Sequence, residues 1–410
     1  MTTTIHSAGQ QANLPERLPL TIWLLSLCNA YLYICSSLLI TVSALIGFDI
    51  APNKSLATLP MAIQFFAIMC GTVPASLFMG HFGRKTGFLL AGCIGITGAS
   101  IALWSVMHDH FLGYCIASVC FGLFAAFANY YRFTAAEVVS DSAKSRAIAM
   151  VMAGGVIAAF IGPNLANWSS ELFSARAFAG PFAILIGVYL ISMLTISLAE
   201  LPAAPKRVAS ASSGRPLATI MLQPVFVVAV ICQMLGYGAM NLVMSSTPLA
   251  MNLHAYGLGA TALVIQWHVV AMFAPSFFTG HLISRFGVVP ILASGVLLGI
   301  ACVMVNLTGE SLPHFIVALM LLGISWNFLF VGGTTLLTDT CTVEERSRTQ
   351  AINDLLVFTT VTLTALTAGG MHHLFGWRIV NLSVLPMFAV SGLAIAWLYF
   401  NQKGQLQHSP

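Results

Sequence analysis

Long apolar runs separated by short polar segments occupy most of this 410-residue chain. A helix needs about 20 apolar residues to cross the hydrocarbon of a bilayer, and each run reaches that length. Apolar and polar residues do not alternate within the runs, as they would in the strands of a membrane barrel. We therefore predict an all-α integral membrane protein with twelve transmembrane helices, at residues 19–47, 57–80, 87–107, 111–136, 147–169, 177–200, 219–247, 257–283, 288–308, 313–338, 349–374 and 379–400.

The composition agrees with lipid as the surroundings of most of the chain. Hydrophobic residues make up 58% of it and charged residues 7%, whereas a soluble domain carries about 25% charged residues. Backbone groups in lipid must be hydrogen-bonded internally, which a helix achieves. The net charge of +4 is small and scattered along the chain. We expect the lipid bilayer as a partner and no nucleic acid.

A basic segment rich in Pro, Ala and Ser divides the runs into two sets of six. It reads LPAAPKRVASASSGRP from Leu201 to Pro216, and this composition is typical of a flexible linker. We expect an N-terminal six-helix half at 1–200, a cytoplasmic linker at 201–218 and a C-terminal six-helix half at 219–410.

Lysine and arginine residues gather on one side of the predicted spans. With the N-terminus in the cytoplasm, twelve of the 16 basic residues face inward, and three, Lys54, Arg176 and Arg378, face outward. Short loops rich in Lys and Arg remain in the cytoplasm. We therefore predict a multi-pass protein of the bacterial inner (plasma) membrane with both termini in the cytoplasm.

Two short basic turns recur at the same point of each half. Residues 80–87 read GHFGRKTG and residues 280–287 read GHLISRFG. Two further loops, which begin at Glu137 and Asp339, align at an offset of 202 and share a Ser-Arg pair. Glycine tolerates the positive φ of a tight turn. The agreement of separate loops on nearly one offset indicates an internal duplication.

These features resemble the Major Facilitator Superfamily over nearly the whole chain. Its loop motif Gly-x-x-x-Asp-Arg-x-Gly-Arg-Arg/Lys corresponds to the turn of Gly83, Arg84 and Lys85, although Gly80 replaces the motif's Asp. The run from Gly154 to Pro163 is similar to the Gly-x-x-x-x-Gly-Pro signature of the family's antiporters. The stretches NLVMSSTPLAM, VIQWHVVAMFAPSFFTGHL and SWNFLFVGGTTLLTD resemble a bacterial subgroup that includes riboflavin importers.

The resemblance implies two rigid halves that rock about a central site, with the basic loops acting as cytoplasmic latches. Glu137 or Asp141 would serve Arg84 and Lys85, and Asp339, Glu344 or Glu345 would serve Arg285. The alternative is that these charges only fix the topology. The latch candidates are Gly83, Arg84, Lys85, Glu137, Arg285 and Asp339.

Ionisable residues at membrane depth are costly and mark candidate functional positions. Arg132 and Asp354 lie near the inner ends of predicted helices 4 and 11. One hypothesis pairs them across the halves as an inner gate that opens when Asp354 is protonated. The alternative is that Arg132 reaches toward the interface and Asp354 stabilises a helix N-terminus. His268, midway along helix 8, is either a proton carrier or a buried packing residue.

Amide and aromatic side chains recur on the helices that the resemblance places around the central site. Gln233, Tyr237 and Asn241 follow each other at i, i+4 and i+8, which is one face of a helix. They line a cavity or form hydrogen bonds between helices. Such side chains suit a planar organic solute, by stacking on its rings and bonding its edges. The cavity candidates are Asn29, Tyr33, Asn129, Tyr130, Gln233, Tyr237, Asn241, Gln266, Trp326 and Asn327.

The sequence therefore predicts a secondary active transporter that moves a small organic solute, planar or aromatic, by alternating access, with protons as the coupling ion. A uniporter of the same fold and a non-transporting sensor or scaffold are the alternatives. We find no motif for ATP binding, hydrolysis or metal binding. We expect a monomer that is not an enzyme and carries no cofactor and no metal.

Overall fold

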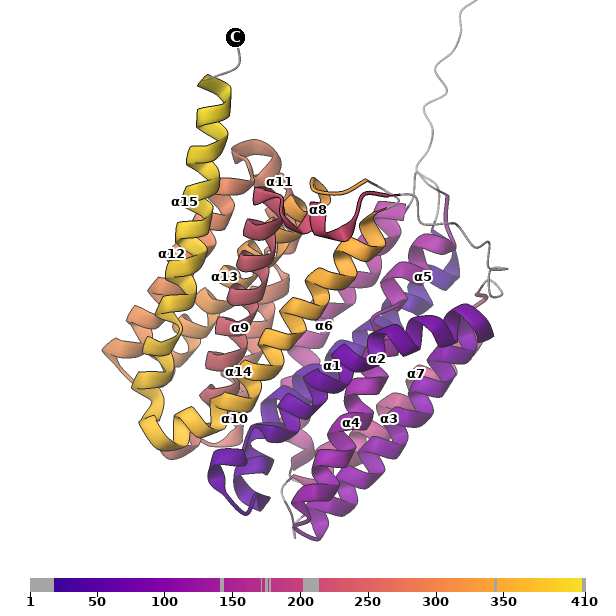
Figure 1. The fold of residues 1–410 in the computed structure, drawn as a ribbon. Helices are drawn as coiled ribbons and strands as arrows, with labels where there is room; N and C mark the ends of the chain where they lie inside the picture. Colours follow the sequence, from indigo (N-terminus) through magenta and orange to yellow (C-terminus); the bar gives the residue numbers. More distant parts are fainter. Residues whose placement is uncertain are drawn as a thin grey trace, which may run out of the picture.

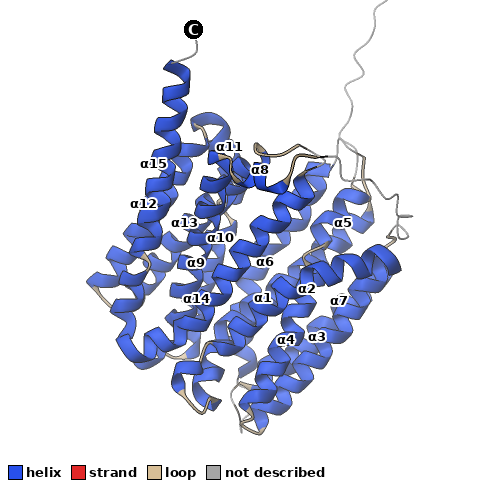
Figure 2. Cartoon of the chain, viewed as in Figure 1, coloured by secondary structure: helices blue, strands red, loops and turns tan. Residues whose placement is uncertain are grey.

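The computed structural model describes residues 18–140, 144–170, 172–173, 176, 178–201, 214–342 and 345–407. Figure 2 shows that these residues form helices and loops and contain no strand. The N-terminal helices are α1 (Leu20–Ile50), the short 3-10 helix η1 (Lys54–Leu56), α2 (Leu59–Phe82), α3 (Arg84–Met107), α4 (Phe111–Ala128), α5 (Tyr131–Glu137), α6 (Lys144–Ser170) and α7 (Ala179–Leu198). The C-terminal helices are α8 (Leu217–Met221), α9 (Pro224–Leu253), α10 (Leu258–Phe273), α11 (Ser276–Phe286), α12 (Val288–Thr308), α13 (Leu312–Thr338), α14 (Arg346–Ser383) and α15 (Leu385–Gln407).

The number of membrane crossings agrees with the sequence-based prediction. Within the described residues, 10 helical stretches are long and apolar enough to span a bilayer, or 11 when the bent pair α10 and α11 counts as one span. One of these stretches, Arg348–Asn401, contains 54 residues, more than twice the length of one crossing. Figure 1 shows it as two antiparallel helices, α14 and α15. Counting them separately gives the predicted twelve.

Buried side chains form two large cores that follow the two halves of the chain. One core draws on residues between Ile22 and Ala199. The other draws mainly on residues between Ile220 and Leu398. In Figure 1 the N-terminal helices lie mainly on the right and the C-terminal helices on the left. We call the end of the bundle that carries η1 the η1 end, and the opposite end, which carries α8, the linker end.

Glycine residues allow helices within each half to approach closely. A Cβ atom at Gly154 of α6 would lie 2.8 Å from the carbonyl oxygen of Ser26 in α1. A Cβ atom at Gly122 of α4 would lie 2.3 Å from the carbonyl oxygen of Gln64 in α2. Helices in lipid are not driven together by the hydrophobic effect, so close packing at small residues stabilises such crossings. These glycines therefore define how the helices pack within each half.

Both repeated basic turns depend on a glycine in a left-handed conformation. Gly83 separates α2 from α3 with φ 89°, and Gly287 separates α11 from α12 with φ 86°. Residues with a side chain rarely adopt this region. The turns therefore connect antiparallel helices in the tight geometry that the sequence motif predicts.

Two predicted helices are broken in the structure. The helix predicted at 111–136 ends at Ala128 and restarts at Tyr131, so Asn129 and Tyr130 lie at a break. The helix predicted at 257–283 is bent by 40° between α10 and α11, next to Pro275. Proline removes a backbone donor and clashes with the preceding turn, which explains the second break.

Candidate functional site

Six aromatic side chains form a continuous group at the centre of the molecule, where the two halves meet. The ring of Tyr33 in α1 lies 5.0 Å from that of Phe273 in α10. Phe273 lies 6.2 Å from Trp326 in α13, and Trp326 lies 5.4 Å from Tyr237 in α9. We call this group the central aromatic cluster; it contains Tyr33, Tyr237, Phe273, Trp326, Phe330 and Phe358.

The indole nitrogen of Trp326 is a buried polar atom of this cluster that lacks a hydrogen-bond partner among the described residues. The Trp326 side chain is buried and stacks on Phe330 at 5.0 Å with an interplanar angle of 11°. Its Nε1 atom has no hydrogen-bond acceptor among the described residues. A buried donor without a partner costs about 1–3 kcal/mol, so a ligand oxygen that accepts from it would recover that energy.

Arg132 and Asp354 lie near the cluster without forming an ion pair. No nitrogen of Arg132 comes within 4.0 Å of a carboxylate among the described residues, and its buried Nε atom has no hydrogen-bond partner there. Asp354 accepts a hydrogen bond of 3.2 Å from Asn353. The charge of Arg132 acts through space on both Asp354 and the Tyr33 hydroxyl. Arg132 and Asp354, the predicted gate pair, therefore lie in the same region of the structure but do not form an ion pair.

The amides of the predicted helix 7 stripe lie between helices in this structure. Gln233 and Asn353 exchange hydrogen bonds of 3.1 and 3.3 Å between α9 and α14. Asn241 donates to the carbonyl of Val361 and to Thr364, both at 3.1 Å. Both amides are buried. The structure thus places Gln233 and Asn241 in a polar seam between α9 and α14. Of the predicted stripe, Tyr237 belongs to the central aromatic cluster.

Asn327 and Asn29 are likewise engaged in packing. Asn327 donates to the carbonyl of Met272 at 2.7 Å and to Ser276 at 2.6 Å, and accepts from Thr279 at 2.7 Å. These bonds hold the bend between α10 and α11. Asn29 donates to the carbonyl of Val151 at 2.9 Å and ties α1 to α6. Both amides are buried and bond neighbouring helices.

His268 is buried between α10 and α13. Its Nδ1 atom lies 2.7 Å from the carbonyl oxygen of Leu319, and because a carbonyl only accepts, Nδ1 carries the proton. The Nε2 atom has no partner among the described residues. His268 is fully buried and bonds a backbone carbonyl, an arrangement that both predicted alternatives, a packing residue and a proton carrier, allow.

The other cavity candidates lie at a helix break or form hydrogen bonds between helices. Asn129 caps α4 and is half-buried. The hydroxyl of Tyr130 donates to the carbonyl of Thr72 at 3.2 Å. Gln266 accepts a hydrogen bond of 2.5 Å from Asn164, which joins α10 to α6 across the two halves. The sequence analysis did not single out Asn164, nor Phe273, Phe330 and Phe358.

The basic residues of the first turn bond one carboxylate and two backbone carbonyls. Arg84 donates two hydrogen bonds, of 3.1 and 2.5 Å, to the carboxylate of Glu137. Lys85 donates to the carbonyls of Ser197 and Ala199 at 2.6 and 3.1 Å. The predicted pairing of Arg84 with Glu137 is present, whereas Lys85 contacts the end of α7. Asp141, the other predicted acid, lies outside the described residues.

The second basic turn has no equivalent pair. Arg285 lies over the ring of Phe286 at 5.3 Å and, like Asp339, forms no ion pair among the described residues. Glu345 instead bonds Arg215 of the linker, at 3.0 and 2.7 Å, and its backbone nitrogen at 2.8 Å. These bonds lower the pKa of Glu345 to about 2. Glu344 lies outside the described residues.

Three hydrogen bonds join the two halves within the described residues. They connect Gln266 to Asn164, Thr359 to Met69, and the backbone nitrogen of Gly369 to Thr58. The last is at the η1 end, where a buried cluster of Ala44, Ala57, Met61 and Leu249 also crosses between the halves. The contacts between the halves therefore run from the middle of the helices to the η1 end.

Sequence comparison relates this arrangement to known transporters. The family described as the Major Facilitator Superfamily matches residues 25–302 and again residues 226–409. The riboflavin transporter RfnT of Brucella anthropi is 36% identical over 354 residues, which cover 86% of this chain and 89% of the relative. The uncharacterized MFS-type transporter YdeG of Bacillus subtilis is 28% identical over 374 residues, which cover 86% of this chain and 84% of the relative.

Solved structures share the fold. A bacterial homolog of the human lysosomal transporter Spinster, in an inward-facing and occupied conformation, aligns with a TM-score of 0.71 at 13% identity and covers 92% of this chain and 96% of its own. The nucleoside transporter NupG aligns with a TM-score of 0.72 at 12% identity and covers 92% of this chain and 99% of its own. With its twelve crossings, its duplicated turns and these matches, the chain belongs to the Major Facilitator Superfamily of membrane transporters.

Proposed function

We propose that this protein carries riboflavin, or a solute with a similar planar heterocycle, across the bacterial plasma membrane. The observation that carries the proposal is the central aromatic cluster, which is built from both halves and contains the unpartnered indole N–H of Trp326. Aromatic rings in offset or edge-on contact favour a flat ring system, and a heterocycle carbonyl would accept from the indole. The relative named as a riboflavin transporter supports the same class of solute.

Alternating access is the mechanism that we propose for this transport. The halves touch from mid-membrane to the η1 end. If the N-terminus is cytoplasmic, as the lysine and arginine distribution predicts, this conformation is closed to the outside and open to the cytoplasm. Rocking of the halves would part the cluster of Ala44, Ala57, Met61 and Leu249 and join the linker ends.

We further propose that Arg132 and Asp354 form the inner gate of that cycle. They come from different halves, and an unpaired Arg132 Nε and a carboxylate bonded by one amide are available for pairing when the linker ends approach. Protonation of Asp354 would weaken the pair and would couple transport to a proton gradient. A uniporter would need no such step, so proton dependence separates the two mechanisms.

Proteoliposomes that contain the purified protein test the function directly. Riboflavin flux is measured with and without an imposed pH gradient, and ribitol, lumichrome and adenosine are added as competitors. We expect saturable riboflavin flux, competition by lumichrome, which retains the ring system, and none by ribitol, which lacks it. Flux equal to that of protein-free liposomes would reject the riboflavin assignment, and flux unaffected by the pH gradient would reject coupling.

A further inference from the structure

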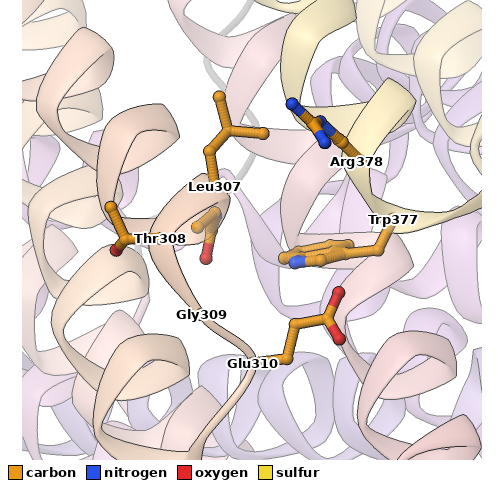
Figure 3. Close-up of a pocket in the computed structure, with 7 residues that line it drawn as sticks. Leu307, Thr308, Gly309, Glu310, Trp377 and Arg378 are labelled. Carbon is orange, nitrogen blue, oxygen red and sulfur yellow. The ribbon is translucent and has the colours of Figure 1, made fainter.

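A polar pocket lies at the η1 end of the C-terminal half, away from the central aromatic cluster. It has a volume of about 230 Å³ and lies between the loop that follows α12 and a break within α14 (Figure 3). The residues that line it are Asn306, Leu307, Thr308, Gly309, Glu310, Trp377 and Arg378.

The break in α14 creates one wall of this pocket. Gly376 adopts φ 77° inside the helix, a conformation that side chains disfavour. The chain bends there, and Trp377 packs against Phe315 at 5.6 Å between ring centroids. Figure 3 shows the indole of Trp377 lying across the pocket beside the turn at Gly309.

Two buried polar atoms on the pocket wall lack hydrogen-bond partners. Trp377 is 5% exposed and its indole N–H has no acceptor among the described residues. Asn306 is 3% exposed, and its side-chain oxygen has no donor there, although its nitrogen bonds Asn381 at 2.7 Å. Buried polar groups are normally paired, so an open donor and an open acceptor in one pocket indicate a polar ligand.

Opposite charges flank these atoms without pairing with each other. Arg378 is exposed and forms no ion pair or hydrogen bond among the described residues. The carboxylate of Glu310 contacts His254 at 2.5 Å through one oxygen and leaves the other open. Figure 3 shows Arg378 and Glu310 on opposite sides of the Trp377 ring. A cation and an anion held apart across a cavity match a ligand that carries both charges.

Three residues beside the pocket along α14 are apolar and exposed. Leu374 is 67% exposed, Phe375 61% and Ile379 41%. Large exposed apolar side chains next to a tryptophan are typical of the level where helices meet lipid headgroups. A ligand with acyl chains would cover these side chains, whereas a small soluble ion would leave them bare.

We propose that this pocket binds the headgroup of a zwitterionic aminophospholipid such as phosphatidylethanolamine. Its phosphate accepts from the Arg378 guanidinium and the Trp377 indole N–H, and its ammonium group donates to Glu310 and to the open oxygen of Asn306. Free phosphoethanolamine shares this chemistry, and the exposed Leu374 and Phe375 favour the lipid. The site lies outside the proposed transport pathway and does not depend on the identity of the solute.

Native mass spectrometry of the purified protein with defined lipids tests the proposal. We expect phosphatidylethanolamine to bind at least about 5-fold more tightly than phosphatidylglycerol, which lacks the ammonium group. Trp377→Phe and Arg378→Gln should each weaken phosphatidylethanolamine binding by about 5- to 10-fold. Glu310→Gln should remove the preference between the two lipids. Arg176→Gln, which changes an arginine predicted on the same side and paired with Asp109, should have no effect.

Three results would overturn the assignment. Equal binding of the two lipids by the unchanged protein would show that the pocket does not recognise the ammonium group. Unchanged lipid retention in both Trp377→Phe and Arg378→Gln would place the lipid elsewhere. Soluble phosphoethanolamine competing at the concentration of the lipid itself would make this a site for a soluble ligand. Trp377→Phe keeps the ring and its contact with Phe315, so it remains informative if the charge variants fold poorly.

Discussion

Arg84 and Glu137 are 53 positions apart and are joined by two parallel hydrogen bonds between guanidinium and carboxylate. The pair connects the first residue of α3 to the last residue of α5. The guanidinium also lies 5.4 Å from the centre of the Tyr130 ring, at the break between α4 and α5. The short helix α5 is therefore fixed to the basic turn through a contact that a single side chain can release.

Glu137→Gln is expected to slow transport more than it destabilises the fold. Exposed ion pairs contribute less than about 1 kcal/mol, so the melting temperature should change little. Loss of the anion frees α5, and we expect the riboflavin transport rate in proteoliposomes to fall several-fold. The control is Asp109→Asn, which removes the exposed pair with Arg176. An equal rate in both variants would show that the Arg84 pair has no latch role.

Exchange of the two charges tests the inner gate. Arg132→Asp and Asp354→Arg should each abolish proton-driven uptake, because either leaves two like charges facing each other. The double exchange should restore part of the flux, since the attraction is symmetrical. Uptake is measured under an imposed pH gradient. If the double variant transports no better than the single ones, the two residues act separately and the gate proposal fails.

Trp326→Phe isolates the hydrogen bond of the indole from its stacking. The ring contacts with Phe330 and Tyr237 are largely kept, whereas the donor is lost. We expect the Kd for riboflavin to rise by about 5- to 10-fold, the cost of one buried hydrogen bond. Trp267→Phe, at an exposed tryptophan beside Phe160, is the matched control. Fluorescence quenching of bound riboflavin provides the Kd, and an unchanged value would remove Trp326 from the solute site.

Gln233→Leu separates packing from solute binding on α9. Gln233 bonds Asn353 and Thr334 between helices, so its loss should lower stability by about 0.6 kcal/mol or more per bond. The Kd for riboflavin should stay within about two-fold of the original value, because the Gln233 side chain bonds neighbouring helices and lies outside the proposed solute site. Thermal unfolding and riboflavin binding are measured on the same preparation. A large rise in the Kd for riboflavin with an unchanged unfolding temperature would instead show that Gln233 lines the solute cavity.

Acid should weaken the attachment of the linker to α14. The pKa of Glu345 in the folded protein is about 2, below its ordinary value of 4.5, because Arg215 and backbone N–H groups stabilise the carboxylate. The stabilisation is complete above the ordinary value and is lost as the pH falls from there toward the folded pKa. Cleavage of the linker by an acid-tolerant protease should therefore accelerate as the pH falls from 4.5 toward about 2, the window set by these two values.

Arg215→Gln should make that cleavage fast already at neutral pH and nearly independent of pH. Arg285→Gln, at an arginine without an acidic partner among the described residues, is the control and should behave like the unchanged protein. A pH response that survives Arg215→Gln would assign the effect to another carboxylate.

The sequence predicted the membrane crossings and the glycine turns because both depend on local properties. Run length determines whether a helix can cross lipid, and the φ values of Gly83 and Gly287 follow from the missing side chain. The partner of Glu345 was missed because Arg215 reaches it from 130 positions away, and no local pattern records that distance.

The central site was only partly predictable for a different reason. Polar residues within apolar helices are easily recognised in the sequence, but Gln233, Asn241 and Asn327 bond other side chains or the backbone inside the bundle. Phenylalanine in an apolar run looks the same whether it faces a solute or a neighbouring helix. Phe273 therefore became visible as a site residue only through its contact with Tyr33 of the other half.

The three hydrogen bonds of Asn327 have a consequence for how the C-terminal half can deform. They tie the end of α10, the start of α11 and α13 to one side chain, and straightening of the 40° bend would break them together inside an apolar interior. The three bonds therefore stabilise the bend against straightening. We therefore expect the displacement that admits a solute to occur at the surface between the two halves, while the angle between α10 and α11 stays the same.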